Sequence, residues 1–125
     1  MAQILVIDDD PVLQQVIRLT LEAAGHTVLR CDNGRKAIDI VTYDHADLIV
    51  TDIIMPEMDG IEMVRAVRRV RPELPIVAIS GGSNGNADDY LGMAKVFGAS
   101  MTLTKPFRPQ DLVTAIAELL ENGSG

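Results

Sequence analysis

Short apolar runs alternate with stripes of apolar residues at helical spacing along the whole of this chain. Runs that stay hydrophobic at consecutive positions are typical of strands buried on both faces. They predict strands at Gln3–Ile7, Thr27–Arg30, Asp47–Thr51, Ile76–Ile79 and Met101–Leu103. Apolar residues that recur every three or four positions predict a helix with one buried face. They predict helices from Pro11 to a stop at Gly25, around Ala37–Val41, along Ile61–Val70, over Asp89–Phe97 and over Gln110–Leu120.

Strands that alternate with helices predict an α/β fold, in which a doubly wound five-stranded parallel sheet has helices on both faces. The length of 125 residues corresponds to one domain. We assign residues 1–121 to that domain and residues 122–125 to a flexible tail or a remnant of cloning. Right-handed crossovers bring the carboxyl ends of all five strands to one edge of the sheet.

The composition limits the classes of function that fit this chain. Apolar residues make up 47% of the chain, which fits a packed core, and aromatic residues make up only 3%. Lys and Arg number 11 against 18 Asp and Glu, for a net charge of −7. This balance argues against direct binding of nucleic acid by the domain. No apolar run approaches the ~20 residues of a membrane span, and Cys31 is the only cysteine. We therefore expect a cytoplasmic protein with no membrane insertion and no internal disulfide.

Polar and charged residues that can take part in catalysis or ligand binding follow four of the five predicted strands. Asp8 and Asp9 follow the first strand, Asp52 the third, Ser80 the fourth and Lys105 the fifth. Ligands of open α/β sheets bind at the edge where these strand ends meet. Asp10, the next residue after the acidic pair, is better explained as the N-cap of the first helix.

The carboxylates at this edge predict a metal site. Like charges 4 Å apart repel by about 4 kcal/mol at an effective dielectric constant of 20, and Lys105 offsets only one of three charges. Oxygen ligands without histidine favour Mg²⁺, since His26 and His45 are isolated in the sequence. A magnesium ion beside a carboxylate suits phosphoryl transfer onto that carboxylate, here Asp52.

The same residues resemble the receiver domain of two-component response regulators, of the chemotaxis-regulator type. The resemblance covers Gln3 to Leu120. It is carried by Asp8-Asp9, by Asp52 with Met55-Pro56-Glu57-Met58-Asp59-Gly60 behind it, by Ser80-Gly81 and by Thr104-Lys105-Pro106-Phe107. It implies a flavodoxin-like receiver fold with strand order 2-1-3-4-5. It also implies a signalling switch rather than a metabolic enzyme.

The resemblance further implies a role for each site residue. Asp52 would accept a phosphoryl group from a histidine kinase or phosphotransfer protein. Asp9, Asp52 and the backbone carbonyl of Ile54 would bind Mg²⁺, with Asp8 acting through water. Ser80 and Lys105 would contact the phosphoryl group, and the switched domain would signal to a protein partner whose identity the sequence does not reveal.

Three features depart from the family pattern. Thr102 stands where receivers carry an aromatic residue that turns inward on activation. The segment from Ser80 to Gly98 is about three residues longer than usual, with the extra length in Gly82–Asn86. Ile54 and Gly82 occupy positions that tune hydrolysis of the phosphoryl group, and neither side chain can activate water.

Two surface features have simpler explanations. The cluster Arg65, Arg68, Arg69 and Arg71 is typical of a solvated helix face. The first helix carries more apolar residues than one face requires, because Leu13 and Ile17 adjoin Val12 and Val16. In the family this helix helps to dock the histidine-bearing bundle of the kinase.

Two other functions fit the same fold. Asp-nucleophile phosphatases place a general acid two residues after the nucleophile, where this chain has Ile54. A binding module that is never phosphorylated would not need the complete set of Asp8, Asp9, Asp52 and Lys105. The sequence therefore favours the receiver over both alternatives.

Overall fold

The computed structural model describes residues 2–8, 10–31, 34–43, 46–52, 60–81, 98–105 and 107–123. Its elements, in chain order, are β1 (Gln3–Ile7), α1 (Pro11–Ala23), β2 (Thr27–Cys31), α2 (Gly34–Tyr43), β3 (Leu48–Asp52), α3 (Gly60–Val70), β4 (Ile76–Gly81), β5 (Met101–Lys105) and α5 (Pro109–Gly123). The predicted helix over Asp89–Phe97 and the extra length in Gly82–Asn86 lie outside the described residues.

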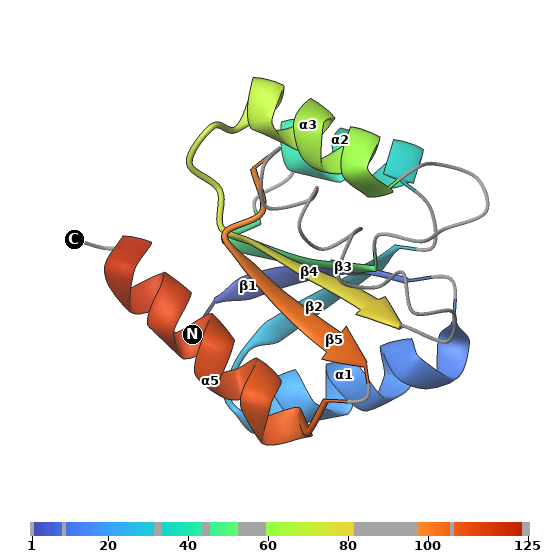
Figure 1. The fold of residues 1–125 in the computed structure, drawn as a ribbon, viewed down its shortest axis with the longest axis vertical. Helices are drawn as coiled ribbons and strands as arrows, with labels where there is room; N and C mark the ends of the chain where they lie inside the picture. Colours follow the sequence, from blue (N-terminus) through green and yellow to red (C-terminus); the bar gives the residue numbers. More distant parts are fainter. Residues whose placement is uncertain are drawn as a thin grey trace.

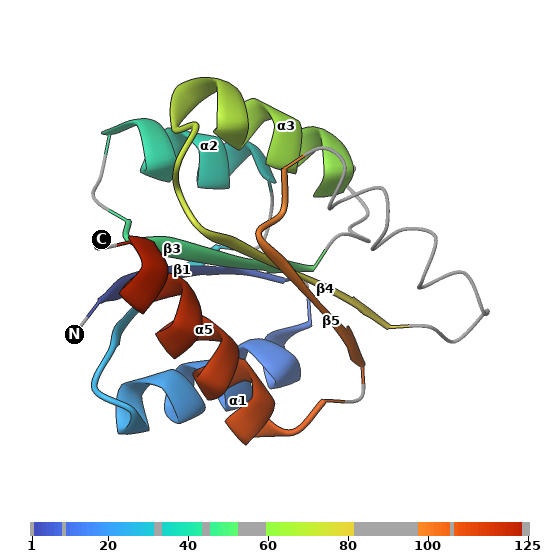
Figure 2. The ribbon, with the colours of Figure 1, turned by 60° about the vertical axis from the view of Figure 1, so that its left-hand side comes forward.

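The five strands form one parallel sheet in the order β2-β1-β3-β4-β5. Helices α2 and α3 cover one face of this sheet, and α1 and α5 cover the other (Figure 1). The turned view separates the same two helical layers (Figure 2). The predicted fold class and strand order are therefore confirmed. No helix within the described ranges has the length and apolar character needed to cross a membrane.

Each face of the sheet has its own hydrophobic layer, because successive side chains of a strand point to opposite faces. Ile49 of β3 belongs to the layer under α2 and α3, and its neighbour Val50 belongs to the layer that contains residues of α1 and α5. The first layer includes Val41, Val64 and Val67, and the second includes Ile17, Leu21, Leu112 and Ile116. The middle strand β3 is buried along its whole length.

Four of the five strands end later than their apolar runs predict, and the first ends at Ile7 as predicted. The third strand extends to Asp52, the fourth to Gly81 and the fifth to Lys105, so polar residues form the last rungs of the ladder. Hydropathy alone places a strand's end at its last apolar residue, whereas main-chain pairing continues past it. The last helix similarly continues to Gly123, three residues beyond its predicted end.

Both ends of α1 match their predicted caps. The Asp10 carboxylate accepts hydrogen bonds from the amides of Val12 (2.9 Å) and Leu13 (3.3 Å), which satisfies two free helix donors. At the other end Gly25 adopts φ of 95°. The amide of Gly25 donates to Glu22, and the amide of His26 donates to Leu21. This pair of bonds is the Schellman arrangement that ends a helix at glycine.

In the sequence of α1 the apolar residues Val12, Val16, Leu19 and Ala23 recur at helical spacing, but the structure buries a different face. Gln14, Ile17 and Leu21 are buried. Val12, Val16 and Leu19 are exposed by 72%, 45% and 53%. Both sets recur at helical spacing, and the set that is buried contains a polar residue, Gln14. The surplus of apolar surface predicted for this helix is therefore confirmed, and it lies on the outer face.

The prediction of a solvated arginine face is correct for Arg65 and Arg69, which are exposed. It is wrong for Arg68 and for Arg71, which are half-buried, and the Arg71 guanidinium donates to the Ala46 carbonyl (3.4 Å). The Arg68 guanidinium donates to the carbonyls of Gly98 (2.8 Å) and Leu74 (2.5 Å) and to the Ser100 hydroxyl (3.3 Å). It is a structural clamp between the end of α3 and the segment that leads into β5. The predicted apolar stripe also ends early, since Val70 is 42% exposed.

Candidate functional site

The register of the sheet places two aspartates side by side. Ile7 of β1 pairs with Thr51 of β3 in a parallel ladder. The next residue of each segment is an aspartate, Asp8 and Asp52. Both are buried, with 2% and 7% of their surface exposed. Charged residues are rarely buried without a partner of opposite charge or a metal, so this pair marks the carboxyl edge of the sheet as a candidate functional site.

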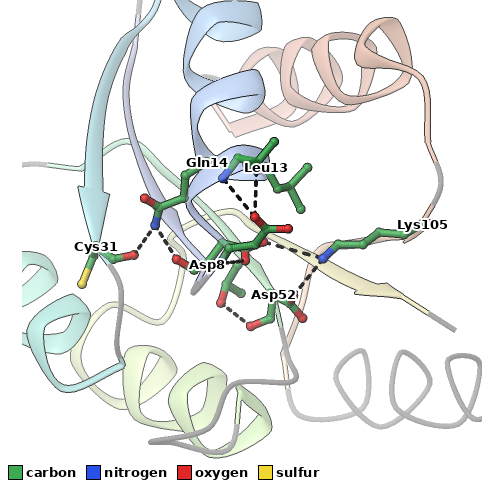
Figure 3. Close-up of polar contacts among 9 residues, drawn as sticks. Asp8, Leu13, Gln14, Cys31, Asp52 and Lys105 are labelled. Atoms are coloured by element: carbon green, nitrogen blue, oxygen red, sulfur yellow. Dashed lines mark hydrogen bonds and ion pairs between the residues drawn. The ribbon is translucent and has the colours of Figure 1, made fainter. Parts of the chain in front are cut away.

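Lys105 supplies a positive charge to both carboxylates. Its Nζ lies 2.9 Å from Oδ2 of Asp52 and 3.7 Å from Oδ2 of Asp8 (Figure 3). Partial burial by itself would lower the pKa of Lys105. The hydrogen bond to Asp52 and the charges of Asp52, Asp8 and Asp10 outweigh burial, so the pKa of Lys105 lies above its ordinary value. The ammonium form therefore persists throughout the neutral range.

Backbone contacts fix the position of Asp8. Its Oδ1 accepts a hydrogen bond from the amide of Asp10 (2.8 Å), and its own amide donates to the Cys31 carbonyl (3.2 Å). The side-chain amide of Gln14 donates to the carbonyls of Asp8 (2.5 Å) and Cys31 (2.7 Å). Sequence reasoning missed Gln14. Its spacing from Ile17 and Leu21 was the available signal, because it places a polar residue in the buried stripe of α1.

The remaining predicted site residues are placed only in part. Ser80 lies in β4 opposite Thr104 of β5, at the edge that carries the aspartates. Thr102 lies in the middle of β5, half-buried and paired with Ala78. The other predicted residues lie outside the described ranges, namely Asp9, Ile54 and Pro106.

The donor set fits a hard divalent cation. Within the described ranges, which omit Asp9, no group of three acidic, histidine or cysteine side chains forms a metal centre. Asp8 and Asp52 nevertheless face one ammonium, so negative charge remains in excess at a buried, oxygen-rich position. Magnesium is typically bound by one or two carboxylates together with water and phosphate oxygens. The residues that are described are compatible with that pattern.

Comparison with known proteins assigns this chain to a family. A family model described as the response regulator receiver domain matches residues 4–117. The chain belongs to this family. Receiver domains are signalling switches, and the fold described above is the one that the sequence resemblance implied.

Two curated relatives show how this receiver domain compares with whole proteins. It is 37% identical to the response regulator receiver protein CpdR of Brucella abortus, covering 96% of this chain and 98% of that protein. It is 32% identical to the response regulator MprA of Mycolicibacterium vanbaalenii, covering 94% of this chain and 50% of that protein. The receiver domain thus spans nearly all of one relative and half of another.

Solved structures agree with the fold. A response regulator receiver domain protein from Clostridium thermocellum superposes with a TM-score of 0.90 at 30% identity, covering 99% of this chain and 98% of that one. The chemotaxis response regulator CheY4 of Vibrio cholerae superposes with a TM-score of 0.84 at 30% identity, covering 95% and 98%. Both are similar over essentially their full length.

Proposed function

We propose that this receiver domain is phosphorylated on Asp52 by a histidine kinase or phosphotransfer protein, in a reaction that requires Mg²⁺. The observation that carries the proposal is the pair of buried carboxylates, Asp8 and Asp52, that share the Lys105 ammonium at the carboxyl edge of the sheet. Membership of the family supports the same chemistry. Residues 1–121 would form the switching unit.

The reaction transfers a phosphoryl group between two side chains. An oxygen of the Asp52 carboxylate attacks phosphorus, and a new P–O bond forms as the P–N bond of phosphohistidine breaks. The electron pair of the P–N bond returns to the imidazole nitrogen, and the ring takes a proton from solvent. Hydrolysis of the acyl phosphate would restore the Asp52 carboxylate and release inorganic phosphate, so the mark is transient.

The residues around Asp52 would share the charge of the phosphoryl group. Lys105 lies within hydrogen-bonding distance of Asp52, so its ammonium is close enough to neutralise an oxygen of the incoming group. The Ser80 hydroxyl would donate to another oxygen. Asp9, Asp52 and the Ile54 carbonyl would hold Mg²⁺, with Asp8 acting through water. When bound, Mg²⁺ would offset negative charge on the phosphoryl oxygens.

The surface beside the site is suited to a protein donor of the phosphoryl group. A groove of about 370 Å³ between α1 and α5 is lined by exposed Val12 and Val16 and reaches Lys105. A kinase helix that covered this groove would bury apolar side chains next to the phosphoacceptor. We assign the kinase to this face and a downstream protein partner to another face. Direct nucleic-acid binding and membrane insertion form no part of the proposal, and we place the protein in the cytoplasm.

The test is intact mass after incubation with acetyl phosphate, with and without Mg²⁺. Wild type should gain one phosphoryl adduct only when Mg²⁺ is present, and Asp52→Asn should gain none. Asp39→Asn, which changes an exposed aspartate of α2, is the matched control and should be modified like wild type. An adduct on Asp52→Asn, or one that forms equally without Mg²⁺, would contradict the assignment.

The two alternatives give different results in the same experiment. A binding module would show no adduct on wild type with acetyl phosphate or with a phosphorylated histidine kinase. A phosphatase would release phosphate from an ester substrate at a steady rate without any kinase. Ile54 stands at the position of the general acid that such phosphatases use, so we expect no ester turnover.

A further inference from the structure

We propose that Gln14 is a positioning residue for Asp8 and thereby for the Mg²⁺ that the proposed function requires. Gln14 is one of four polar or charged residues that are buried in the described part of the chain, together with Asp8, Thr51 and Asp52. Asp8 and Asp52 form the acidic pair at the site. Gln14 lies on α1, on the opposite side of Asp8 from Lys105 (Figure 3).

The two hydrogen bonds of Gln14 account for both donors of its side-chain amide. A primary amide nitrogen carries two N–H groups. One donates to the carbonyl of Asp8 at the end of β1, and the other donates to the carbonyl of Cys31 at the end of β2. The side chain therefore joins the helix α1 to the ends of two neighbouring strands.

These bonds complete a set of contacts that leaves Asp8 little freedom. The Asp8 amide donates to Cys31, and the Asp8 carbonyl accepts from Gln14. Its carboxylate accepts from the Asp10 amide and pairs with Lys105. The backbone amide, the backbone carbonyl and Oδ1 of Asp8 are thus held by hydrogen bonds, and Oδ2 lies 3.7 Å from the Lys105 ammonium. Loss of the Gln14 donors would remove the hydrogen bond that holds the Asp8 carbonyl.

Metal binding is sensitive to such support. Magnesium requires near-ideal octahedral geometry, and partners that orient a metal's ligands typically change metal affinity 10- to 100-fold when they are removed. An apolar side chain at position 14 would also remove the side-chain donor to the Asp8 carbonyl and one of the donors to the Cys31 carbonyl, which would keep its hydrogen bond from the Asp8 amide. A glutamate would set its oxygens against both carbonyls. The site therefore needs a side chain that offers two donors.

The experiment compares four proteins by calorimetric titration with Mg²⁺ and by urea unfolding. Gln14→Met keeps the side chain's length and removes both donors, and we expect its dissociation constant for Mg²⁺ to rise about 10- to 100-fold. Gln14→Arg presents two donors again and should recover most of the affinity. Gln15→Met makes the same change at the adjacent, half-buried position and should bind Mg²⁺ within twofold of wild type.

A purely structural role gives a different pattern. Gln14→Met would then unfold at lower urea while folded protein bound Mg²⁺ with the wild-type dissociation constant, and that result would overturn the proposal. If Gln14→Met does not fold, the wild type itself provides the test by nuclear magnetic resonance. The side-chain amide protons of Gln14 should exchange slowly and shift on titration with Mg²⁺, and unshifted signals would overturn the proposal.

This inference rests on the proposed function, and the titration separates the two. Wild type that binds no Mg²⁺ contradicts the metal-dependent function itself, together with this inference. Wild type that binds Mg²⁺ while Gln14→Met binds equally well contradicts the role of Gln14 alone. Tighter binding by wild type than by Gln14→Met, with recovery in Gln14→Arg, supports both.

Discussion

Lys105 is the residue on which the charge balance of the site depends. It is the cation that the structure places against both buried carboxylates, and its side chain is only 26% exposed. Without it Asp8 and Asp52 would be adjacent anions shielded from water. Removal of one partner from a buried ion pair costs more than the pair contributes, because the remaining charge stays desolvated.

We predict that Lys105→Met lowers the free energy of unfolding in Mg²⁺-free buffer by about 1–3 kcal/mol at pH 7, which is less than for a fully buried pair because solvent screens the partly exposed ammonium. Methionine retains the apolar stem and removes only the charge. Urea unfolding measures the loss. Arg35→Met, which removes a positive charge at an exposed position of α2, should stay within about 0.5 kcal/mol of wild type.

The pH dependence of this difference identifies its origin. The pKa of Lys105 is raised in the folded state, so its contribution to stability is complete below its unfolded pKa of about 10.5. It is lost as the pH rises through the folded pKa. The gap between wild type and Lys105→Met should therefore be constant from pH 7 to 9 and should narrow only as the pH rises above about 10.5. A gap that is unchanged at high pH would indicate lost packing instead.

At the scale of elements, the spacing of apolar residues along the chain predicted which segments become strands and helices. This spacing was less informative about which residues of each helix are buried. On α1 two residue sets share helical spacing, and the choice between them depends on which side the sheet lies. Gln14 packs inward because its amide meets carbonyls from two strands. Those acceptors come from β1 and β2, so no pattern within the helix could reveal them.

Arg68 shows the same limit on α3. Its neighbours on the helix suggest a solvated charge, whereas its acceptors are carbonyls about 30 residues further along the chain and on the α3–β4 connection. Gly98 fits closely beneath it: its φ is 130°, and a Cβ there would lie 2.7 Å from the Arg68 Cγ. Glycine is needed both for this backbone conformation and for the approach of the guanidinium.

We predict that Arg68→Met lowers the free energy of unfolding by about 2–4 kcal/mol, because several half-buried carbonyls lose a charged donor. Arg68→Lys should recover only part of this loss, since a single ammonium cannot replace the planar fork. Urea unfolding compares both with Arg69→Met, which changes an exposed arginine and should remain within about 0.5 kcal/mol of wild type. Equal losses at the two positions would show that helix charge, rather than the clamp, accounts for the effect.

For the whole molecule, the parallel topology is what makes the site predictable. Asp8, Asp52 and Lys105 are far apart in sequence and meet because Asp8 directly follows β1, whereas Asp52 and Lys105 end β3 and β5 of the same sheet. The order of strands and helices predicts which edge of the sheet carries the strand ends, and therefore which residues lie at that edge. The exact ends of the strands and the positions of buried polar side chains such as Gln14 depend on contacts between elements. The hydrophobic pattern of the sequence does not encode these contacts. The unfolded chain has no such site.

This coupling between topology and site predicts that Mg²⁺ stabilises the entire fold. A ligand that binds only the folded state adds about 2.7 kcal/mol to the free energy of unfolding at 100 times its dissociation constant. Wild type should gain this amount in urea unfolding with MgCl₂, and Asp52→Asn should gain much less, because one of the carboxylates is lost. NaCl at equal ionic strength controls for screening of the net charge of −7. Asp39→Asn, which keeps the site intact, should gain as much as wild type. An equal gain in Asp52→Asn would mean that Mg²⁺ acts on the general charge of the surface and that the aspartate pair is not its binding site.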